Sequence, residues 1–197
     1  VTTTDELIPS GETSSYRSNP VKLSEFALSR KDPQYVPRAK EVLAVERLRR
    51  TNPGDPRVGE ALLGHDPADT GLGSLVMALK PGDGSAREQA ASCQRVLGAG
   101  ANLALEYATK RYRSNCINWG MLPFLVKSAD MVENGDWVFV PGIRKVLLEG
   151  GEEATAYAVH DGTVTSFPVS LGHLTAPERQ ILADGCLINY YQHSARK

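Results

Sequence analysis

The feature of this chain that most restricts its fold is an apolar run followed at once by a glycine-rich turn and a helical pattern. The run is Leu75–Leu79, the turn is Pro81–Ser85, and apolar residues at helical spacing follow over residues 86–97. A buried strand, a tight turn and a helix in this order are typical of the corner of an α/β unit. Gly98 then ends the helix, and residues 101–107 alternate as a second strand. The stretch therefore predicts a right-handed βαβ unit with parallel strands.

The start of this helix is predicted to bind an anion. Ser85 and Glu88 have the spacing of a capping box, in which each side chain accepts from the backbone N–H of the other residue. Gly82 and Gly84 let the backbone come close to a bound group, and a helix N-terminus favours negative charge. Arg87 carries a planar fork suited to a carboxylate or phosphate. From these residues alone, a capped surface helix with a solvated Arg87 is an equal alternative, and the glycine spacing matches neither a dinucleotide fingerprint nor a P-loop.

Three segments of the chain resemble one known domain. Residues 84–91, Gly-Ser-Ala-Arg-Glu-Gln-Ala-Ala, resemble the Gly-Ser-Ser-Arg-Glu-His-Ala-Ala signature of the C-terminal swivel domain of the aconitase family. That family includes aconitase, homoaconitase and the isopropylmalate isomerases. Residues 3–11 with Tyr16-Arg17 resemble its Thr-Thr-Asp-His-Ile-Ser-x-x-Gly…Phe-Arg segment, at the same interval. Residues 112–124 resemble its Ile-His-x-x-Asn-Leu…Gly-x-Leu-Pro-Leu segment.

The resemblance implies an α/β fold of the swivelling β/β/α three-layer type, with a parallel βαβ core and a small C-terminal β section, forming a single domain over residues 1–197. It implies a hydro-lyase that dehydrates and rehydrates a hydroxy di- or tricarboxylic acid. In the resembled family a 4Fe–4S cluster lies on other domains, so we expect a cluster-bearing partner, fused N-terminally or separate, and no cluster on this chain. The isolated domain is then expected to be inactive.

Four residues are predicted to form the site because of their positions in the matching segments. The resemblance makes Ser85 the catalytic base, acting as an alkoxide, and makes Arg87 and Arg17 two clamps for substrate carboxylates. Asp5 matches an aspartate beside the site that orients Arg17. A serine hydroxyl serves as a base only where N–H donors and cations hold the anion, which a helix N-terminus beside arginines can do.

The chain also departs from the family pattern. Ala86 replaces the second serine of the signature, Ile8 stands where aconitases have a serine, and Glu6 and Gln89 replace histidines. We therefore name no substrate, and the chain resembles a divergent bacterial hydratase more than aconitase itself. The departures motivate an alternative of another class, a non-catalytic module that senses carboxylates or docks a partner and has kept the fold.

Composition argues against several other classes of protein. With 22 Lys and Arg against 23 Asp and Glu, the net charge of −1 gives no pull towards nucleic acid or an anionic membrane. No apolar run approaches the ~20 residues of a membrane span, and no leader pattern is visible, so a cytoplasmic location is expected. Cys93, Cys116 and Cys186 are widely separated, which predicts buried reduced thiols rather than a metal site of this chain.

The rest of the chain gives a coarse order of elements. The expected elements are helices near residues 21–28 and 39–50, an irregular connection over 51–73, a helix over 109–119, a strand over 121–126 placed at a sheet edge or bulge by Pro123, and a strand over 137–140. These are followed by a hairpin of residues 154–160 and 163–169, a helix from a Thr175–Glu178 capping box to Gly185, and a final strand over 186–191. The arginines at 47, 49 and 50 are expected to be a solvated helix end.

Overall fold

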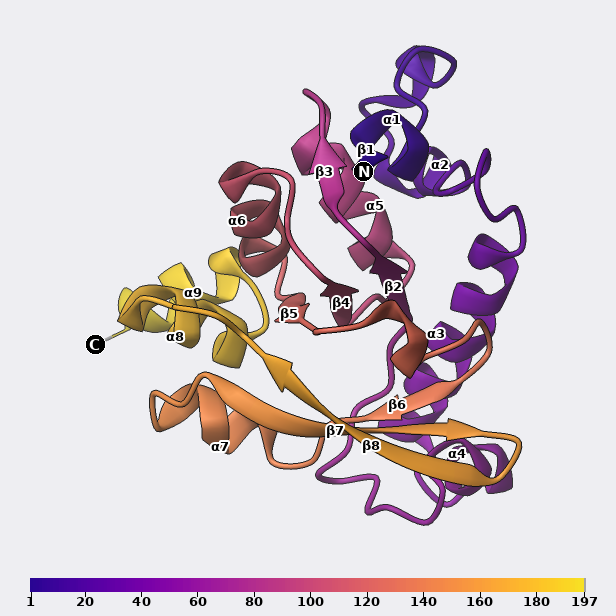
Figure 1. Ribbon diagram of the computed structural model, residues 1–197, viewed down its shortest axis with the longest axis vertical. Coiled ribbons are helices and arrows are strands. Elements are labelled where there is room, and N and C mark those ends of the chain that lie inside the picture. The colour runs from indigo at the N-terminus through magenta and orange to yellow at the C-terminus, as the bar shows by residue number, and fades with distance from the viewer. Residues whose placement is uncertain (197) are drawn as a thin grey trace.

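The computed structural model describes residues 1–196 and contains a six-stranded mixed sheet surrounded by helices (Figure 1). The strands are β1 (Thr2–Thr3), β2 (Leu75–Ala78), β3 (Pro81–Asp83), β4 (Ala101–Ala104), β5 (Leu122–Leu125), β6 (Trp137–Phe139), β7 (Glu153–His160) and β8 (Thr163–Ser170). The helices are α1 (Thr4–Leu7), α2 (Pro20–Ser24), α3 (Tyr35–Thr51), α4 (Pro56–Ala61), α5 (Arg87–Val96), α6 (Lys110–Asn118), α7 (Ile143–Leu148), α8 (Ala176–Asp184) and α9 (Leu187–Ser194), with 3-10 turns η1 (Ser14–Tyr16) and η2 (Ala129–Met131).

The predicted βαβ unit is confirmed and is followed by a second one. Strands β2, β4 and β5 are parallel neighbours, with α5 connecting the first two and α6 the next two. The register runs from Leu75 opposite Ala101 to Ala78 opposite Ala104. Because both helices follow strands of one parallel set, both begin near the carboxyl edge of that set, where ligands bind in open α/β sheets.

The sequence predicted an edge strand or a bulge at Pro123; the edge strand is wrong, because β5 lies between β4 and β8 in the sheet. On one side of the strand, the Leu122 N–H donates to the Gly100 carbonyl just before β4, and the Val126 N–H donates to the Ala104 carbonyl of β4. The Pro123 nitrogen points to the other side, where the pairing with β8 is limited to Leu125 opposite Ser170. The missing proline N–H therefore costs no ladder hydrogen bond.

The second half of the sheet is antiparallel and is built on the predicted hairpin. Strands β7 and β8 pair over their full length, from Glu153 opposite Ser170 to His160 opposite Thr163. The turn residues Asp161 and Gly162 have φ values of +45° and +81°, as a two-residue hairpin loop requires. Strand β6 adds to the outer side of β7 and forms the far edge of the sheet.

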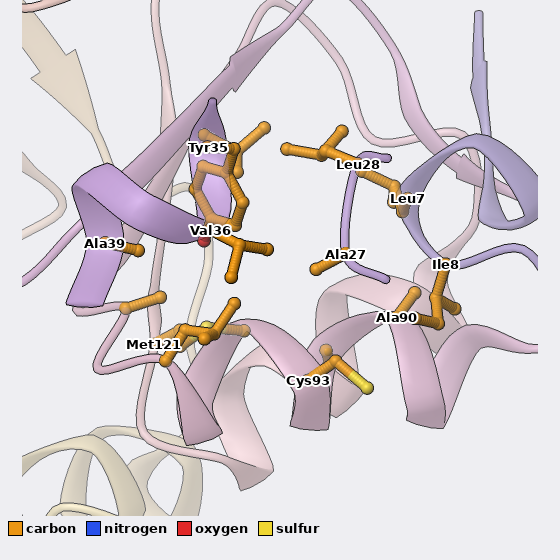
Figure 2. Close-up of a cluster of buried hydrophobic side chains, with 14 of the residues drawn as sticks. Leu7, Ile8, Ala27, Leu28, Tyr35, Val36, Ala39, Ala90, Cys93 and Met121 are labelled. Carbon is orange, nitrogen blue, oxygen red and sulfur yellow. The ribbon is translucent and has the colours of Figure 1, made fainter. Parts of the chain in front are cut away.

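Two clusters of buried apolar side chains hold these layers together. The first packs α1, α2 and α3 against α5, and Figure 2 shows Ile8 beside Ala90 in this cluster. The second lies between the sheet, the β7–β8 hairpin and helices α7 and α8, with Phe124 and Phe167 fully buried in it. The alternation along β2 reflects this arrangement, since Val76 belongs to the first cluster while its neighbour Leu75 packs on the second.

The final segment is a helix, α9, and not the strand expected from the sequence. Gly185, at φ +94°, ends α8, which begins at the predicted Thr175–Glu178 capping box. The Asn189 amide then donates to the Asp184 carbonyl and fixes the first turn of α9. Leu187 and Tyr190, three residues apart, pack on the second cluster, so one helical face is used.

The arginine-rich C-terminal end of α3 was expected to be solvated, but two of its arginines bind a buried carboxylate. Arg49 forms two 2.7 Å hydrogen bonds to the buried Glu46 carboxylate and a 2.6 Å bond to the Pro67 carbonyl. Arg50 and the Leu72 N–H donate to the same carboxylate. This network ties α3 to the connection over residues 51–73, which also contains α4.

Among residues 1–196, every helix is too short or too polar to cross a lipid bilayer.

Candidate functional site

The loop that carries Ser85 leaves a short strand that pairs with the N-terminus. Strand β3 lies parallel to β1, with Thr2 opposite Pro81 and Thr3 opposite Asp83. Thr3 also forms a capping box with Glu6 at the start of α1. The first motif of the chain is therefore fixed directly beside the loop of the second motif, an arrangement that the sequence pattern did not predict.

The two glycines of this loop are required by close contacts with other parts of the chain. A Cβ on Gly82, at φ +100°, would lie 2.3 Å from the Tyr112 ring. A Cβ on Gly84, at φ +133°, would lie 2.1 Å from the Thr4 Oγ1. The sequence predicted a close approach to a ligand; in the structure the close approach is to side chains of α1 and α6.

The predicted Ser85–Glu88 capping box is absent. Helix α5 begins at Arg87 with Ala86 as its N-cap, and no side chain caps it. The Glu88 carboxylate instead accepts a 3.1 Å hydrogen bond from the Trp119 indole. Since Ala86 supplies no side-chain oxygen, the N–H groups of the first turn stay available for an anion. Ser85 is exposed, and its hydroxyl forms no hydrogen bond within residues 1–196.

Ser85 and Arg87 line one cavity of about 310 Å³ at this helix start. The other lining residues are Glu88 of α5 and four residues of α6, namely Lys110, Arg111, Ser114 and Asn115. The Arg87 Nε is buried and has no hydrogen-bond partner among the described residues. A larger hollow of about 450 Å³ between α3 and β6 contains none of the predicted site residues.

Arg17 and Asp5 do not line this cavity. Arg17 is exposed just after η1. The Asp5 carboxylate is paired with Arg30 and accepts a 3.1 Å hydrogen bond from the Ser10 N–H. Within the described part of the chain, no hydrogen bond joins Asp5 to Arg17. The structure therefore brings together two of the four predicted residues.

The α6 residues of the cavity were missed by sequence reasoning. The sequence pattern places Lys110 and Arg111 in the helix expected over residues 109–119 and gives them no role in the site. The available signal was topological, because α6 follows β4 and so begins at the same sheet edge as α5. Figure 1 shows β3, α5 and α6 together at this end of the molecule, and α5 packs directly on α6.

The chain's own residues do not fit a metal cluster. No group of three or more His, Cys, Asp or Glu side chains among residues 1–196 is placed to hold a metal ion. Cys93 and Cys116 are buried, and burial raises the pKa of each thiol to about 12, so both are neutral at physiological pH. Cys186 is only partly buried. An iron–sulfur cluster needs several cysteine ligands together, and residues 1–196 place no such group of cysteines.

The parallel βαβ units and the antiparallel hairpin define a mixed α/β fold of the swivel type. No protein-family model matches the chain, and no curated protein matches it. A solved structure of 3-isopropylmalate dehydratase (leuD) from Methanocaldococcus jannaschii shares the fold, with a TM-score of 0.62 and 21% identity over 98% of this chain and 88% of that chain. The likeness to the swivel domain of the aconitase and isopropylmalate isomerase family is therefore confirmed for the fold.

Proposed function

We propose that this chain is the substrate-clamping swivel domain of an aconitase-like hydro-lyase. Its substrate would be a hydroxy di- or tricarboxylic acid. The observation that carries the proposal is the position of Ser85 and Arg87 in one cavity at an uncapped helix start. The support from outside the chain is the fold shared with a protein described as a dehydratase.

Ser85 is the proposed base. Dehydration of a hydroxy acid requires removal of a weakly acidic C–H proton, and a serine hydroxyl is a poor base at neutral pH. The alkoxide is favoured here by the free N–H groups at the start of α5 and by the Arg87 guanidinium in the same cavity. Because Ser85 is not engaged in helix capping, its oxygen is free to take the proton.

Arg87 is the proposed clamp for a substrate carboxylate. Its planar fork can bind a carboxylate through two parallel hydrogen bonds, which fixes both position and orientation. Arg17 and Asp5 remain in the proposal as the second clamp and its orienting partner. Since neither lines the cavity, they would contact a substrate that extends beyond its opening.

A partner is needed to complete the reaction. A 4Fe–4S cluster on cluster-bearing domains, fused to this chain or separate, would supply a Lewis acid for the leaving hydroxyl. The chain, proposed to be one domain over residues 1–197, would then bind a hydroxy acid weakly when isolated and show no turnover. A cytoplasmic location also remains part of the proposal.

The test is dehydration by the complete enzyme, reconstituted anaerobically and assayed on several hydroxy acids. We expect Ser85→Ala to lower kcat by at least about 100-fold with little change in KM. Arg87→Lys keeps the charge but loses the fork, so KM should rise. Ser166→Ala, on an exposed serine of β8 outside the cavity, is the matched control. Unaltered turnover in Arg87→Lys would contradict the clamp assignment.

A non-catalytic carboxylate sensor or docking module is the second candidate. The position of Arg17 outside the cavity and the alanine at position 86 favour it. The test uses the reconstituted protein with an intact cluster. If it binds carboxylates through Arg87 but turns over no hydroxy acid, the result supports the sensor over the enzyme.

A further inference from the structure

Strand β2 forms one edge of the six-stranded sheet, and within residues 1–196 its one strand neighbour is β4. On the far side of β4, the Gly100 and Ala104 carbonyls accept hydrogen bonds from the β5 segment. The backbone groups of successive residues in a strand point to opposite sides, so those of Ala101 and Leu103 point towards β2.

The outer edge of β2 consists of the backbone groups of Leu75 and Met77. In a parallel ladder, a residue that faces the neighbouring strand bonds to the two residues that flank its partner. The partners of Ala101 and Leu103 are Leu75 and Met77, so the bonds go to the flanking residues of β2. The N–H and C=O groups of Leu75 and Met77 therefore point away from β4. Among residues 1–196 these four groups form no hydrogen bond, as on an open sheet edge.

This open edge lies along a groove. Leu75 and Met77 both line two hollows, of about 390 Å³ and about 450 Å³. Tyr35 and Arg38 of α3 also line both hollows, as does Asn134 between η2 and β6, so the two hollows adjoin. Figure 1 shows α3 beside β2, on the side away from β4. We call the two hollows together the β2 groove.

The shape of the groove favours an extended peptide as its occupant. Strand β1 already pairs in this way with the segment that follows β2, where the Thr2 N–H donates to the Lys80 carbonyl at 2.9 Å, and Thr2 also lines the groove. A second copy of this chain fits poorly, because its own β2 lies between the same two walls and cannot reach this edge. A single extended segment can enter and supply the alternating donors and acceptors that the edge lacks.

The charge of the groove favours a basic peptide. Near the amino end of β2, the lining contains Glu41, Glu133 and Asp136 against one cation, Arg38. Arg38 is already paired with Asp32. The histidine at the end of β7 is paired with Asp136 and lies 4.0 Å from Glu133, so one histidine serves two carboxylates. Negative charge therefore exceeds positive charge at this end of the groove.

We propose that the β2 groove binds an extended basic peptide segment of a partner protein, which joins the sheet as a further strand. The segment pairs with the backbone of Leu75 and Met77, and a lysine or arginine of the segment lies beside Glu41 and Glu133. Neither the predicted base nor the predicted clamps line the groove, so this inference is independent of the proposed hydro-lyase activity.

The test is the binding of a synthetic peptide, acetyl-Lys-Val-Thr-Val-Thr-Val-amide, to the full 197-residue chain. We expect N-methylation of alternate residues to weaken binding by at least about tenfold in one of the two possible patterns, because only one set of N–H groups faces β2. Replacing the lysine of the peptide by glutamate should also weaken binding severalfold. In the protein, bound peptide should slow amide hydrogen exchange at Leu75 and Met77 specifically.

A protein variant tests the location. Asn134→Trp places a large side chain in the groove from an exposed position, and it should weaken the peptide by at least about tenfold. Asn52→Trp is the matched control, because Asn52 is also exposed and lies outside both hollows. Circular dichroism and thermal unfolding establish that both variants are folded.

The remaining outcomes overturn the inference. Absence of binding below about 1 mM peptide excludes the proposed occupant. Equal binding of the parent and both N-methylated peptides rules out strand pairing, and equal effects of Asn134→Trp and Asn52→Trp rule out the groove. If the chain sediments as a dimer that Asn134→Trp alone dissociates, the occupant is a second copy and the proposal is wrong. Arg87→Gln should leave peptide binding unchanged, so a failure of the proposed catalytic site is seen separately.

Discussion

The Thr4 hydroxyl occupies the space that a side chain on Gly84 would need, 2.1 Å from the position of its Cβ. This contact joins the N-terminal segment to the loop that presents Ser85. The parallel pairing of β1 with β3 fixes the same two segments one residue away. The geometry of the candidate site therefore depends on a contact between residues 80 positions apart in the chain.

Gly84→Ala is expected to displace the Ser85 loop. The substitution places a side chain at φ +133° and against Thr4, so strain and overlap combine. We expect a loss of about 2–4 kcal/mol in the free energy of unfolding and weaker binding of carboxylates. Gly135→Ala is the matched control, because Gly135 also has a positive φ, +96°, but no atom within 4 Å of the added Cβ. Urea unfolding of both variants should show a larger loss of unfolding free energy for Gly84→Ala. Equal losses would contradict the close contact between Thr4 and residue 84.

Tyr112→Phe is expected to destabilise the junction of α5, β4 and α6. Its hydroxyl accepts from Gln94 Nε2 at 2.9 Å and from Asn102 Nδ2 at 3.0 Å, and all three side chains are buried. Removing the oxygen leaves two amide donors without this partner, which should cost about 1–3 kcal/mol in urea unfolding. Tyr191→Phe, on an exposed side chain of α9, should cost nothing measurable. A cost for Tyr112→Phe no greater than that of the control would argue against the network.

The parts of the fold that the sequence predicted correctly depend on local signals. The βαβ unit, the Asp161-Gly162 hairpin and the Thr175–Glu178 capping box are each specified by residues within a few positions of one another. The spacing of apolar residues and the residue types of the turns specify these elements locally. The same applies to placing Ser85 and Arg87 together, because they lie two residues apart.

The parts that the sequence did not predict depend on distant partners. Glu88 does not cap its own helix because Trp119, 31 residues later, binds its carboxylate. The cations of α6 reach the cavity only because β4 places that helix beside α5. Strand β1 pairs with β3, although nearly eighty residues of the chain separate the two strands. Sequence patterns report preferences of short segments, and these contacts override them.

His160 is expected to make stability depend on pH. Its hydrogen bond and charge interaction with Asp136 raise its pKa above the usual 6.5. The pKa of Asp136 is lowered below 3.8: burial opposes the shift, but the Glu133 N–H and His160 outweigh it. The histidine contribution is complete below its unfolded pKa and is lost as pH rises through the raised pKa. The aspartate contribution is present above 3.8 and is lost as pH falls through the lowered pKa.

The difference in melting temperature between the natural chain and His160→Gln should therefore be largest between about pH 4 and 6.5. Above that range the difference should shrink. His65→Gln, on an exposed histidine that forms no ion pair among residues 1–196, is the control. If the difference in melting temperature for His160→Gln grows with rising pH, the charged His160 does not stabilise the fold through Asp136, and the prediction is contradicted.

Glu46→Gln is expected to loosen the contact between α3 and residues 67–72. Glu46 is 7% exposed, and its carboxylate accepts from Arg49, from Arg50 and from the Leu72 N–H. Burial raises the pKa of Glu46, but these hydrogen bonds outweigh it, so the pKa lies below the usual 4.5. The ionised form is therefore the one that the fold stabilises, and its contribution is lost as pH falls through the lowered pKa.

Glutamine keeps the shape of Glu46 but removes the charge, so we expect a loss of about 1–3 kcal/mol in the free energy of unfolding at pH 7. The loss should diminish as pH falls below 4.5 and through the lowered pKa of Glu46, because the natural carboxylate then also becomes protonated. Glu153→Gln, on an exposed side chain of β7, should show neither the loss nor its pH dependence. A penalty for Glu46→Gln that is the same at pH 3 and pH 7 would mean that packing, and not the carboxylate charge bound by Arg49, anchors this connection to α3.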